Sequence, residues 1–280
     1  MAEPRHMAAR ALTVGSITHL GEDHTGAHVC TGSHGGLAVG RYALFRRVCS
    51  LICHDAGIGM DDAGIRALEF LDTYGLAAAA VDHRTARIGD SDDMVARGII
   101  SCVNRIATDC GVAGGMSCAR AFEIMQKNAP APEIPENIVS GVFRRIAVQG
   151  SCEIGVHALD SASSITDEDA GHVVVTGSHG GLPGAVRGNA IKAKVMFAAF
   201  NDAGVGIDEA GIARLAALDD VGVAAVAVCC RSARIGDGLS TYETGTVSHA
   251  NHRARSLGAA HGIPLRDYID QLLRKLPKND

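Results

Sequence analysis

The chain has 280 residues, a length that suits two domains of ordinary size. Its composition, with 47% apolar and 20% charged residues, is that of a globular protein, and a formal net charge of −5 offers no basic surface for nucleic acid. Aromatic residues make up only 4%, so we expect cores of Ala, Val, Ile and Leu and little stacking on bases or sugars.

Cysteine usage and hydropathy predict a cytoplasmic protein. The nine cysteines are an odd number, no two have the CxxC spacing, and several lie inside apolar runs, which is typical of buried thiols. Residues 1–10 lack the apolar segment of a signal peptide, and the longest apolar run, at 221–230, is too short to cross a bilayer. We therefore expect no membrane partner.

Three polar motifs occur twice, in the same order. The sequence TGSHGG at residues 31–36 returns 145 residues later, at 176–181. Two further motifs return 147 residues later: DAG(I/V)G, at 55–59 and 202–206, and ARIGD, at 86–90 and 233–237. Because the order is kept and the offsets differ by only two residues, the motifs predict a duplicated domain. The polar character of the repeated residues predicts a doubled or composite site.

Apolar runs alternate with helical patterns in both halves. Strands are expected at residues 28–30, 49–53, 76–81, 172–175, 195–200 and 222–230. Shorter strand candidates precede the repeats, near residues 12–17 and 145–148. Helices are expected near residues 61–74, 94–108, 190–194, 208–219 and 242–257.

Continuous apolar strands separated by helices predict parallel sheets covered on both faces. We therefore expect an α/β protein of two tandem Rossmann-like parallel-sheet domains, related by internal duplication and a pseudo-twofold axis. The first repeat is expected at residues 1–125 and the second at 143–280, joined by a proline-containing linker at 126–142. Ligands of open parallel sheets bind beyond the carboxyl ends of the strands, where all three motifs are expected to lie.

The TGSHGG motif, which we call the glycine loop, allows two chemical interpretations. Its backbone N–H groups are typical of an anion site at a helix N-terminus. Alternatively, Ser33 and Ser178 take the serine position of a nucleophile elbow, although threonine replaces the first glycine of that motif. A plain turn would need the glycines but not the serines or the adjacent His34 and His179, and a GxGxxG dinucleotide fingerprint is absent. The glycines concerned are Gly32, Gly35, Gly36, Gly177, Gly180 and Gly181.

An acid follows a buried strand in each copy. Asp55 and Asp202 either cap the next turn through their own backbone or act as a general base or metal ligand near the glycine loop. Asn201 is a candidate ligand-binding residue, and because the first copy has His54 at this position, the two sites are not expected to be equivalent.

The ARIGD motif carries one arginine and one acid in each copy. Arg87 and Arg234 are candidates for a bidentate clamp on a carboxylate or phosphate. Asp90 and Asp237 are further candidates for ligand binding; the alternative is an internal ion pair, in which they are the partners of the two arginines within the motif.

Beyond ARIGD the copies diverge. Ser240 and Thr241 of the second copy are candidates for binding the ligand or for capping the following helix. A small polar stripe on the predicted helices is expected to pack against the partner half; its members are Gly98, Ser101, Asn104, Gly245, Ser248 and Asn251.

The leading functional hypothesis is a hydrolase or lyase acting on a small carboxylate-bearing metabolite, such as an amide or a cyclic imide. Arg87 and Arg234 would hold the anion, and the glycine-loop amides would stabilise a developing oxyanion. The nucleophile and the acid–base groups would come from Ser33, His34, Asp55, Ser178, His179 and Asp202.

Two alternatives stay open. A non-catalytic anion-binding or sensor protein would use the same groups only as hydrogen-bond donors. A metal-dependent enzyme would gather His34, His179, Asp55 and Asp202 around Zn²⁺, Mn²⁺ or Fe²⁺, but no close ligand spacing such as HExxH supports it. We therefore expect no cofactor, with a divalent metal as the alternative, and a small anionic metabolite as the partner. Assembly into a homo-oligomer stays open.

Overall fold

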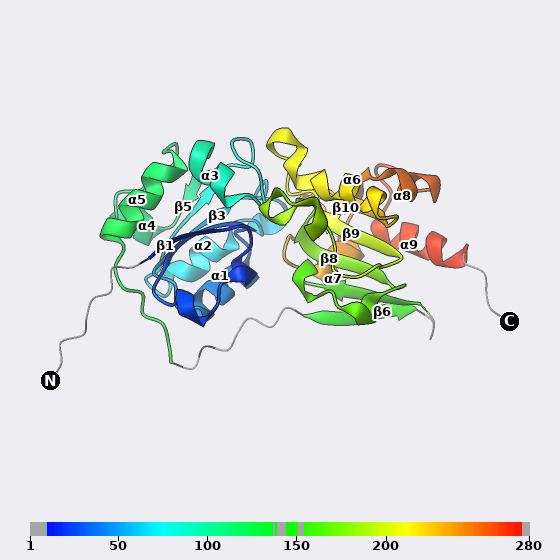
Figure 1. Cartoon of the computed structure of the whole chain (residues 1–280), viewed down its shortest axis with the longest axis horizontal. Helices are drawn as coiled ribbons and strands as arrows, with labels where there is room; N and C mark the ends of the chain where they lie inside the picture. The colour runs from blue at the N-terminus through cyan, green and yellow to red at the C-terminus, as the bar shows by residue number, and fades with distance from the viewer. Residues whose placement is uncertain (1–9, 137, 139–143, 151–153, 276–280) are drawn as a thin grey trace.

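Two β-sheets organise the chain, one in each half (Figure 1). The computed structural model describes residues 10–136, 138, 144–150 and 154–275. The first sheet has the strand order β1-β2-β3-β4-β5, in which β1 to β4 are parallel and β5 is antiparallel to β4. Its strands are β1 (Ala11–Val14), β2 (His28–His34), β3 (Ser50–His54), β4 (Ala77–Val81) and β5 (Ile100–Val103).

The second sheet repeats this arrangement with one additional strand. Strands β7 to β10 are parallel, and β6 and β11 run antiparallel at the two edges. The strands are β6 (Arg145–Gly150), β7 (Gly155–Leu159), β8 (Val173–His179), β9 (Phe197–Asn201), β10 (Ala224–Val228) and β11 (Val247–Ala250). The predicted α/β class is confirmed as two mostly parallel mixed sheets.

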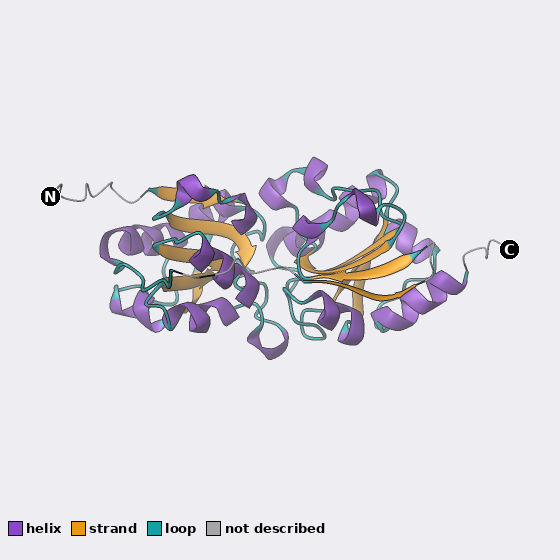
Figure 2. Ribbon diagram, turned by 90° about the horizontal axis from the view of Figure 1, so that it is seen from below, coloured by secondary structure: helices purple, strands orange, loops and turns teal. Residues whose placement is uncertain are grey.

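Helices cover both faces of each sheet (Figure 2). In the first half they are α1 (Leu37–Phe45), α2 (Arg66–Asp72), α3 (Ser91–Arg97), α4 (Arg105–Asp109) and α5 (Cys118–Asn128). In the second half they are α6 (Ala213–Asp220), α7 (Gly238–Thr244), α8 (His252–Ser256) and α9 (Leu265–Arg274). None of the helices in the described part of the chain is both long and apolar enough to cross a membrane.

The strands are apolar on both sides because each side meets a helical layer. Val29 and Leu51 face α1 and α2, whereas their neighbours Cys30 and Ile52 face α3, α4 and α5. Small residues fill the centre of the first sheet, and Ala77 to Ala80 are fully buried. In the second half Phe197 packs edge to face with Tyr268 of α9, at 5.4 Å between ring centroids.

Two helix predictions are wrong in the same way. The segments at 94–108 and 242–257 each contain a helix end, an antiparallel strand and a second short helix. Gly98 ends α3 and Asn104 caps α4, so the four residues of β5 between them pair with β4. The predicted polar stripe is therefore spread over three elements, and Asn104 and Asn251 bond within their own halves rather than to the partner half.

Other boundaries also differ from the predictions. Residues 190–194 form no helix, and the helix predicted at 208–219 begins only at Ala213, after the 3₁₀ segment Ile207–Ile212. The strand predicted at 145–148 is the antiparallel edge strand β6, and β7 was not predicted. The predicted linker begins inside α5, and its residues 137 and 139–142 lie outside the described residues.

The halves meet through the loops that follow β3, β4, β9 and β10. Met60 donates its N–H to the carbonyl of Cys230, and Ile207 donates its N–H to the carbonyl of His83, both at 2.8 Å. The apolar centre of the contact takes three residues from each half: Ala56, Ala63, Ile88, Ala203, Ala210 and Ile235. The carboxyl edges of the two parallel sheets therefore face each other. Because the described parallel strands follow chain order without a reversal, the junction of the two sheets, rather than a switch point within one, supplies the crevice.

Candidate functional site: a cavity between the two halves

The glycine loop belongs to the strand in both halves. Strand β2 continues to His34, and the register between β2 and β3 shifts after Cys30, so that the next pair is His34 with His54. Strand β8 does the same, and His179 pairs with Asn201. Because the strand bulges here, each histidine reaches the carboxyl edge of its sheet.

The second residue of the motif must be glycine because the ARIGD loop passes directly over it. A Cβ on Gly32 would lie 2.6 Å from the carbonyl carbon of Gly89, and a Cβ on Gly177 would lie 2.6 Å from that of Gly236. Gly89 and Gly236 donate their N–H groups to the Gly32 and Gly177 carbonyls, at 2.8 and 2.7 Å. Both glycines therefore serve packing rather than ligand approach.

The remaining glycine amides are already occupied. Gly35 and Gly180 donate to the carbonyls of His54 and Asn201, at 2.9 and 2.8 Å. Gly36 donates to Nδ1 of His34 at 3.0 Å, and Gly181 donates to Nδ1 of His179 at 3.1 Å. These four amides are therefore not available to an oxyanion, and a regular helix follows the motif only in the first half.

These bonds fix the state of the two histidines. A ring nitrogen that accepts an N–H carries no proton, so neutral His34 and His179 carry their proton on Nε2. Burial, with a smaller effect of His54, lowers the pKa of His34 to about 4. Burial, followed by the charge of Arg214, lowers the pKa of His179 well below its usual value. Both rings are neutral at pH 7, and neither Nε2 has a hydrogen-bond partner among the described residues.

Each histidine also reaches the opposite half. A Cβ on Gly236 would lie 3.0 Å from Cε1 of His34, and a Cβ on Gly89 would lie 3.5 Å from Cε1 of His179. The two histidines therefore lie at the junction, each against the ARIGD loop of the other half.

In the described structure, the hydroxyl oxygens of both glycine-loop serines accept hydrogen bonds from backbone N–H groups. Oγ of Ser33 accepts the N–H of Ile17 at 2.9 Å, and Oγ of Ser178 accepts the N–H of Ala162 at 2.8 Å. No bond joins either serine to a histidine among the described residues. Each serine hydroxyl hydrogen is therefore available to a ligand.

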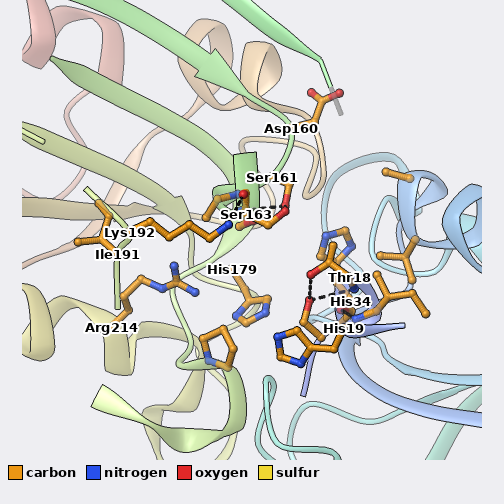
Figure 3. Close-up of a pocket in the computed structure, with 18 of the residues that line it drawn as sticks. Thr18, His19, His34, Asp160, Ser161, Ser163, His179, Ile191, Lys192 and Arg214 are labelled. Carbon is orange, nitrogen blue, oxygen red and sulfur yellow. Dashed lines mark hydrogen bonds between the residues drawn. The ribbon is translucent and has the colours of Figure 1, made fainter. Parts of the chain in front are cut away.

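All four residues line one cavity of about 590 Å³ between the halves (Figure 3). That volume lies within the range of small-molecule sites. The structure thus brings Ser33, His34, Ser178 and His179 together, as predicted for a shared cleft. The cavity is also lined by groups that sequence analysis missed, namely Ser16, Thr18, His19, Asp160, Ser161, Ser163, Lys192 and Arg214.

Part of the missed lining is visible in the sequence. Ser16 and Thr18 form a turn in which their hydroxyls lie 2.9 Å apart, and the hydroxyls of Ser161 and Ser163 lie 2.8 Å apart in the corresponding turn. These pairs share the offset of 145 with the glycine loop, so a Ser-x-(Ser/Thr) motif was available as a signal.

Lys192 and Arg214 carried no such signal because neither is repeated. Arg214 is 4% exposed, and its Nε and Nη2 donate to the carbonyl of Gly181 at 3.1 and 2.8 Å. Lys192 donates to the carbonyl of Ser163 at 2.6 Å. Both cations lie on the second-half side of the cavity, beside His179 (Figure 3).

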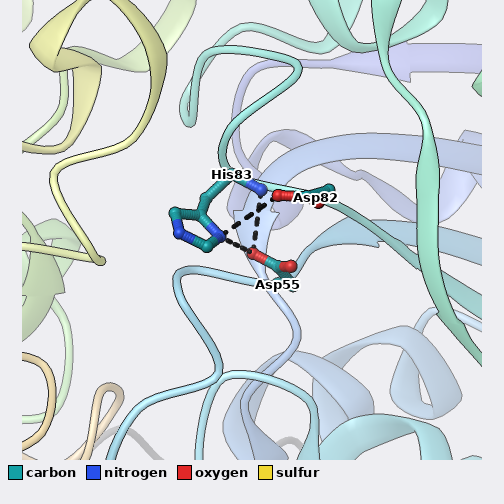
Figure 4. A group of neighbouring side chains, drawn as sticks. All are labelled: Asp55, Asp82 and His83. Carbon is teal, nitrogen blue, oxygen red and sulfur yellow. Dashed lines mark hydrogen bonds and ion pairs between the residues drawn. The ribbon is translucent and has the colours of Figure 1, made fainter.

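Asp55 and Asp202 are placed away from this cavity. Oδ1 of Asp55 accepts the N–H of Gly57 and both the N–H and Nδ1–H of His83, each at 3.0 Å (Figure 4). Asp202 accepts from Gly204 and Cys230 in the same manner. Burial raises the pKa of Asp55, but these hydrogen bonds outweigh burial and leave the pKa lowered. The bonds to Gly57 and Gly204 are those of the capping alternative, and the bonds to His83 and Cys230 join each acid to the next loop of its own half.

Asn201 and His54 perform one structural task with different chemistry. His54 accepts the N–H of Ala56 on Nδ1 at 3.1 Å and donates from Nε2 to the carbonyl of Ala86 at 3.0 Å. Asn201 accepts from Ala203 at 2.9 Å and donates to Ala233 at 3.1 Å. Neither lines the cavity, so the difference between them leaves the ligand site unchanged.

The arginines of ARIGD form ion pairs across the junction. Arg87 lies 3.4 Å from Asp208, and Arg234 lies 2.7 Å from Asp61. Arg87 also lies 3.1 Å from Asp90, which is the predicted internal pair, whereas Asp237 pairs with Arg144 at 3.0 Å. Neither arginine of the motif lines the cavity between the glycine loops, although Arg234 lines a second hollow nearby together with Arg41, Arg66 and Arg144.

The last predicted ligand-binding residues take structural positions. Asp90 and Asp237 cap α3 and α7, each accepting an N–H at 3.0 Å. Ser240 accepts the N–H of Arg234 at 3.0 Å, and the Thr241 hydroxyl donates to the carbonyl of Asp237 at 3.1 Å. The cap of α7 is therefore Asp237, not Ser240 or Thr241.

In the described part of the chain, one group of side chains has the spacing of metal ligands. Ligand atoms of Asp55, Asp82 and His83 lie within 4.8 Å of one another, and the group includes neither glycine-loop histidine (Figure 4). Nδ1–H of His83 is bonded to Asp55, which raises the pKa of His83 despite its partial burial. His83 and Asp55 thus form a hydrogen-bonded ion pair, and Asp82 is a second acid close to His83.

Comparison of this chain with protein-family models, with curated proteins and with solved structures finds no match.

Proposed function

We propose that this protein binds a small carboxylate-bearing metabolite in the cavity between its two halves. The observation that carries the proposal is the uniform polarity of the glycine-loop side chains. His34 and His179 each accept a backbone N–H on Nδ1 and offer Nε2–H, and the two serines offer their hydroxyl hydrogens. A wall of donors is complementary to a ligand rich in acceptor oxygens.

The doubled wall is best explained by duplication. We infer that the halves descend from one domain, because the hydrogen bonds of both histidines, both serines and both strand-end acids recur at the sequence offsets of the motifs. Fusion of two such Rossmann-like domains through their carboxyl edges would give one composite cavity in place of two separate sites.

Calorimetric titration tests the binding proposal. Wild-type protein is titrated with a panel of small carboxylates, with inorganic phosphate, and with the neutral amides of the same acids. We expect at least one carboxylate to bind, and the variants His34→Ala and His179→Ala to bind it up to about tenfold more weakly, since each loses one hydrogen bond to the ligand, worth about 0.5–1.5 kcal/mol. His54→Asn is the control, because His54 is buried but does not line the cavity. Affinities equal to wild type in both cavity variants would refute the proposal.

A second candidate function is hydrolysis of an amide or cyclic imide at the same site. It is favoured by the neutral state of the two imidazoles, because a neutral N–H donor can polarise a carbonyl and stabilise the oxyanion that follows. No base is hydrogen-bonded to Ser33 or Ser178 among the described residues, so water is the proposed nucleophile. His19, whose ring has no hydrogen-bond partner among the described residues, is the lining group that takes its proton. The hydroxide adds to the carbonyl carbon, the C–N bond breaks, and the nitrogen receives the proton.

Succinimide, glutarimide and their open-chain amides are suitable substrates for this test. Turnover that falls in His34→Ala and His179→Ala but persists in the double variant Ser33→Ala/Ser178→Ala would support polarisation without a serine nucleophile. Loss of turnover in the serine variant would instead restore the nucleophile hypothesis. If the protein binds these compounds but forms no product, hydrolysis is excluded and only the binding function remains.

A further inference from the structure

The two ends of the cavity differ in charge although their backbones correspond. Arg214 donates its N–H to the carbonyl of Gly180 at 2.7 Å, and Ala67 donates its N–H to the carbonyl of Gly35 at 2.8 Å. The two residues therefore occupy the same place relative to their glycine loops. One is a buried cation that lines the cavity, and the other is a fully buried methyl group.

Among the described residues, the charge of Arg214 has no anionic partner. Its guanidinium bonds only to backbone carbonyls, of Gly181 and Ala190, and lies 4.8 Å above the ring of Phe200. No carboxylate lies within 4.0 Å of it among the described residues. Burial lowers the pKa of Arg214 to about 10, so the group remains charged at pH 7. A buried unpaired cation is costly, and an anionic ligand would offset that cost.

The other charged groups of the lining reinforce this polarity. Lys192 lies on the same side as Arg214 (Figure 3), at the surface and with its ammonium 2.6 Å from the Ser163 carbonyl. Asp160, the acid of the lining, is already paired with Arg144 at 2.8 Å. The first half contributes no Arg or Lys to the described lining, and beside its hydroxyls and imidazoles it presents the apolar side chains of Ile17, Ala38 and Val39.

We propose that the ligand is a monocarboxylate whose carboxylate lies between Arg214 and Lys192 and whose uncharged end lies against Ala38 and Val39 of the first half. The inference rests on the proposed binding function and adds the orientation and the number of charges. The glycine-loop donors then contact the middle of the ligand, where a hydroxyl or carbonyl oxygen would accept from His34 and His179. A dicarboxylate of the same length would place its second charge against Ala38 and Val39, and the first-half lining of the described cavity has no Arg or Lys to pair with it.

Three probes of equal length, butyrate, butyramide and succinate, separate charge from shape; they test the charged end alone, because none carries the central oxygen that His34 and His179 would bind. Wild-type protein is titrated calorimetrically with each at pH 7.5. We expect butyrate to bind at least about tenfold more tightly than butyramide, which lacks the charge, and than succinate, which carries two. Succinate binding as tightly as butyrate would overturn the single charged end.

Variants of the charged end complete the test. Arg214→Ala reproduces the residue at position 67, and Lys192→Gln alters only an exposed side chain, so it reports even if Arg214→Ala fails to fold. Each is expected to weaken butyrate binding about tenfold or more and to leave butyramide binding unchanged. Arg231→Ala is the matched control, because Arg231 is exposed and does not line the cavity.

Carboxylate binding that depends on His34 and His179 but not on Arg214 or Lys192 would overturn this inference and leave the proposed function standing. Failure of every carboxylate to bind would remove both.

Discussion

Gly57 and Gly204 lie back to back at the junction of the two halves. A Cβ on Gly57 would lie 2.8 Å from Cα of Gly204, and a Cβ on Gly204 would lie 2.9 Å from Cα of Gly57. Both residues have a φ of 73°, in the left-handed region that favours glycine. The contact therefore requires glycine twice over, for backbone conformation and for space.

Alanine at either position is expected to lower the free energy of unfolding by about 2–4 kcal/mol, about 1 kcal/mol of it from backbone strain. Gly75→Ala is the control, since Gly75 has a φ of 68° but open space around it, and it should cost only the strain. Urea unfolding of the three variants measures the difference. Equal losses in Gly57→Ala and Gly75→Ala would show that the close approach contributes nothing.

The cross-junction ion pairs should contribute little by comparison. Arg234 and Asp61 are 47% and 54% exposed, and pairs at such positions are typically worth less than about 1 kcal/mol. Arg234→Gln and Asp61→Asn should each lower the unfolding free energy by no more than that, with a smaller loss at high salt. Their affinity for a bound carboxylate should equal that of wild type. A tenfold loss of affinity in Arg234→Gln would return Arg234 to the ligand site, as its sequence motif predicts.

The central strands could be predicted from the sequence because their burial on both faces leaves long apolar runs, whereas β7, which is only partly buried, was missed. Prediction failed at β5 and β11 because these strands have only four residues and are half-buried, so the neighbouring helical pattern continues through them. The turn chemistry of Gly98 and Asn104 held the missing information. A glycine that ends one helix and an asparagine that caps the next leave room for a strand between them.

The cavity could be predicted only as far as it is symmetric. Repeated Ser-His pairs pointed to Ser33, His34, Ser178 and His179, all of which line it. The same criterion overvalued the repeated acids and arginines, because the junction between the halves also demands residues in matched pairs. It could not detect Arg214 and Lys192, which have no counterpart in the first half.

The buried histidines should make the protein sensitive to mild acid. His34 has a pKa of about 4 in the folded chain, against an ordinary histidine pKa of 6.5, so the unfolded chain binds a proton first as the pH falls. The stabilisation is complete above pH 6.5 and is lost as the pH falls from there toward 4, by roughly 2 kcal/mol at pH 5 for this residue alone. The Asp55–His83 pair does not cause this loss, because it is intact between the ordinary pKa values of its two members.

Urea unfolding at pH 7.5 and pH 5.0 checks this expectation. Wild type should lose stability between the two values, and His34→Ala should lose roughly 2 kcal/mol less than wild type over the same interval. Parallel losses in the two proteins would mean that His34 does not titrate in this range.

His54→Asn should be tolerated because the second half already uses asparagine for the same two hydrogen bonds. We expect a change of less than about 1 kcal/mol in unfolding free energy at pH 7.5, since an acceptor and a donor are both retained. Burial lowers the pKa of His54, so the variant should also lose less stability than wild type at pH 5. His54→Ala, which leaves the Ala56 N–H and the Ala86 carbonyl unpaired, should be the more damaging change at pH 7.5. If His54→Asn proves as destabilised as His54→Ala, the two positions do not correspond.

Asn104 joins three elements through one side chain, and its loss should be costly. Its Oδ1 accepts the N–H of Ala78 in β4 at 3.0 Å and of Ala107 in α4 at 2.9 Å, and its Nδ2 donates to the carbonyls of Leu76 at 2.8 Å and of Leu68 in α2 at 3.3 Å. Asn104→Ala leaves these buried groups without partners and should lower the unfolding free energy by about 2–4 kcal/mol. Ser101→Ala is the control from the same predicted stripe, because it removes a single bond of 3.2 Å at a half-buried site and should cost less than about 1.5 kcal/mol. Chemical denaturation ranks the two. If Ser101→Ala lowers the unfolding free energy more than Asn104→Ala, the predicted helical stripe would be favoured over the structure, in which Ser101 lies in β5 and Asn104 caps α4.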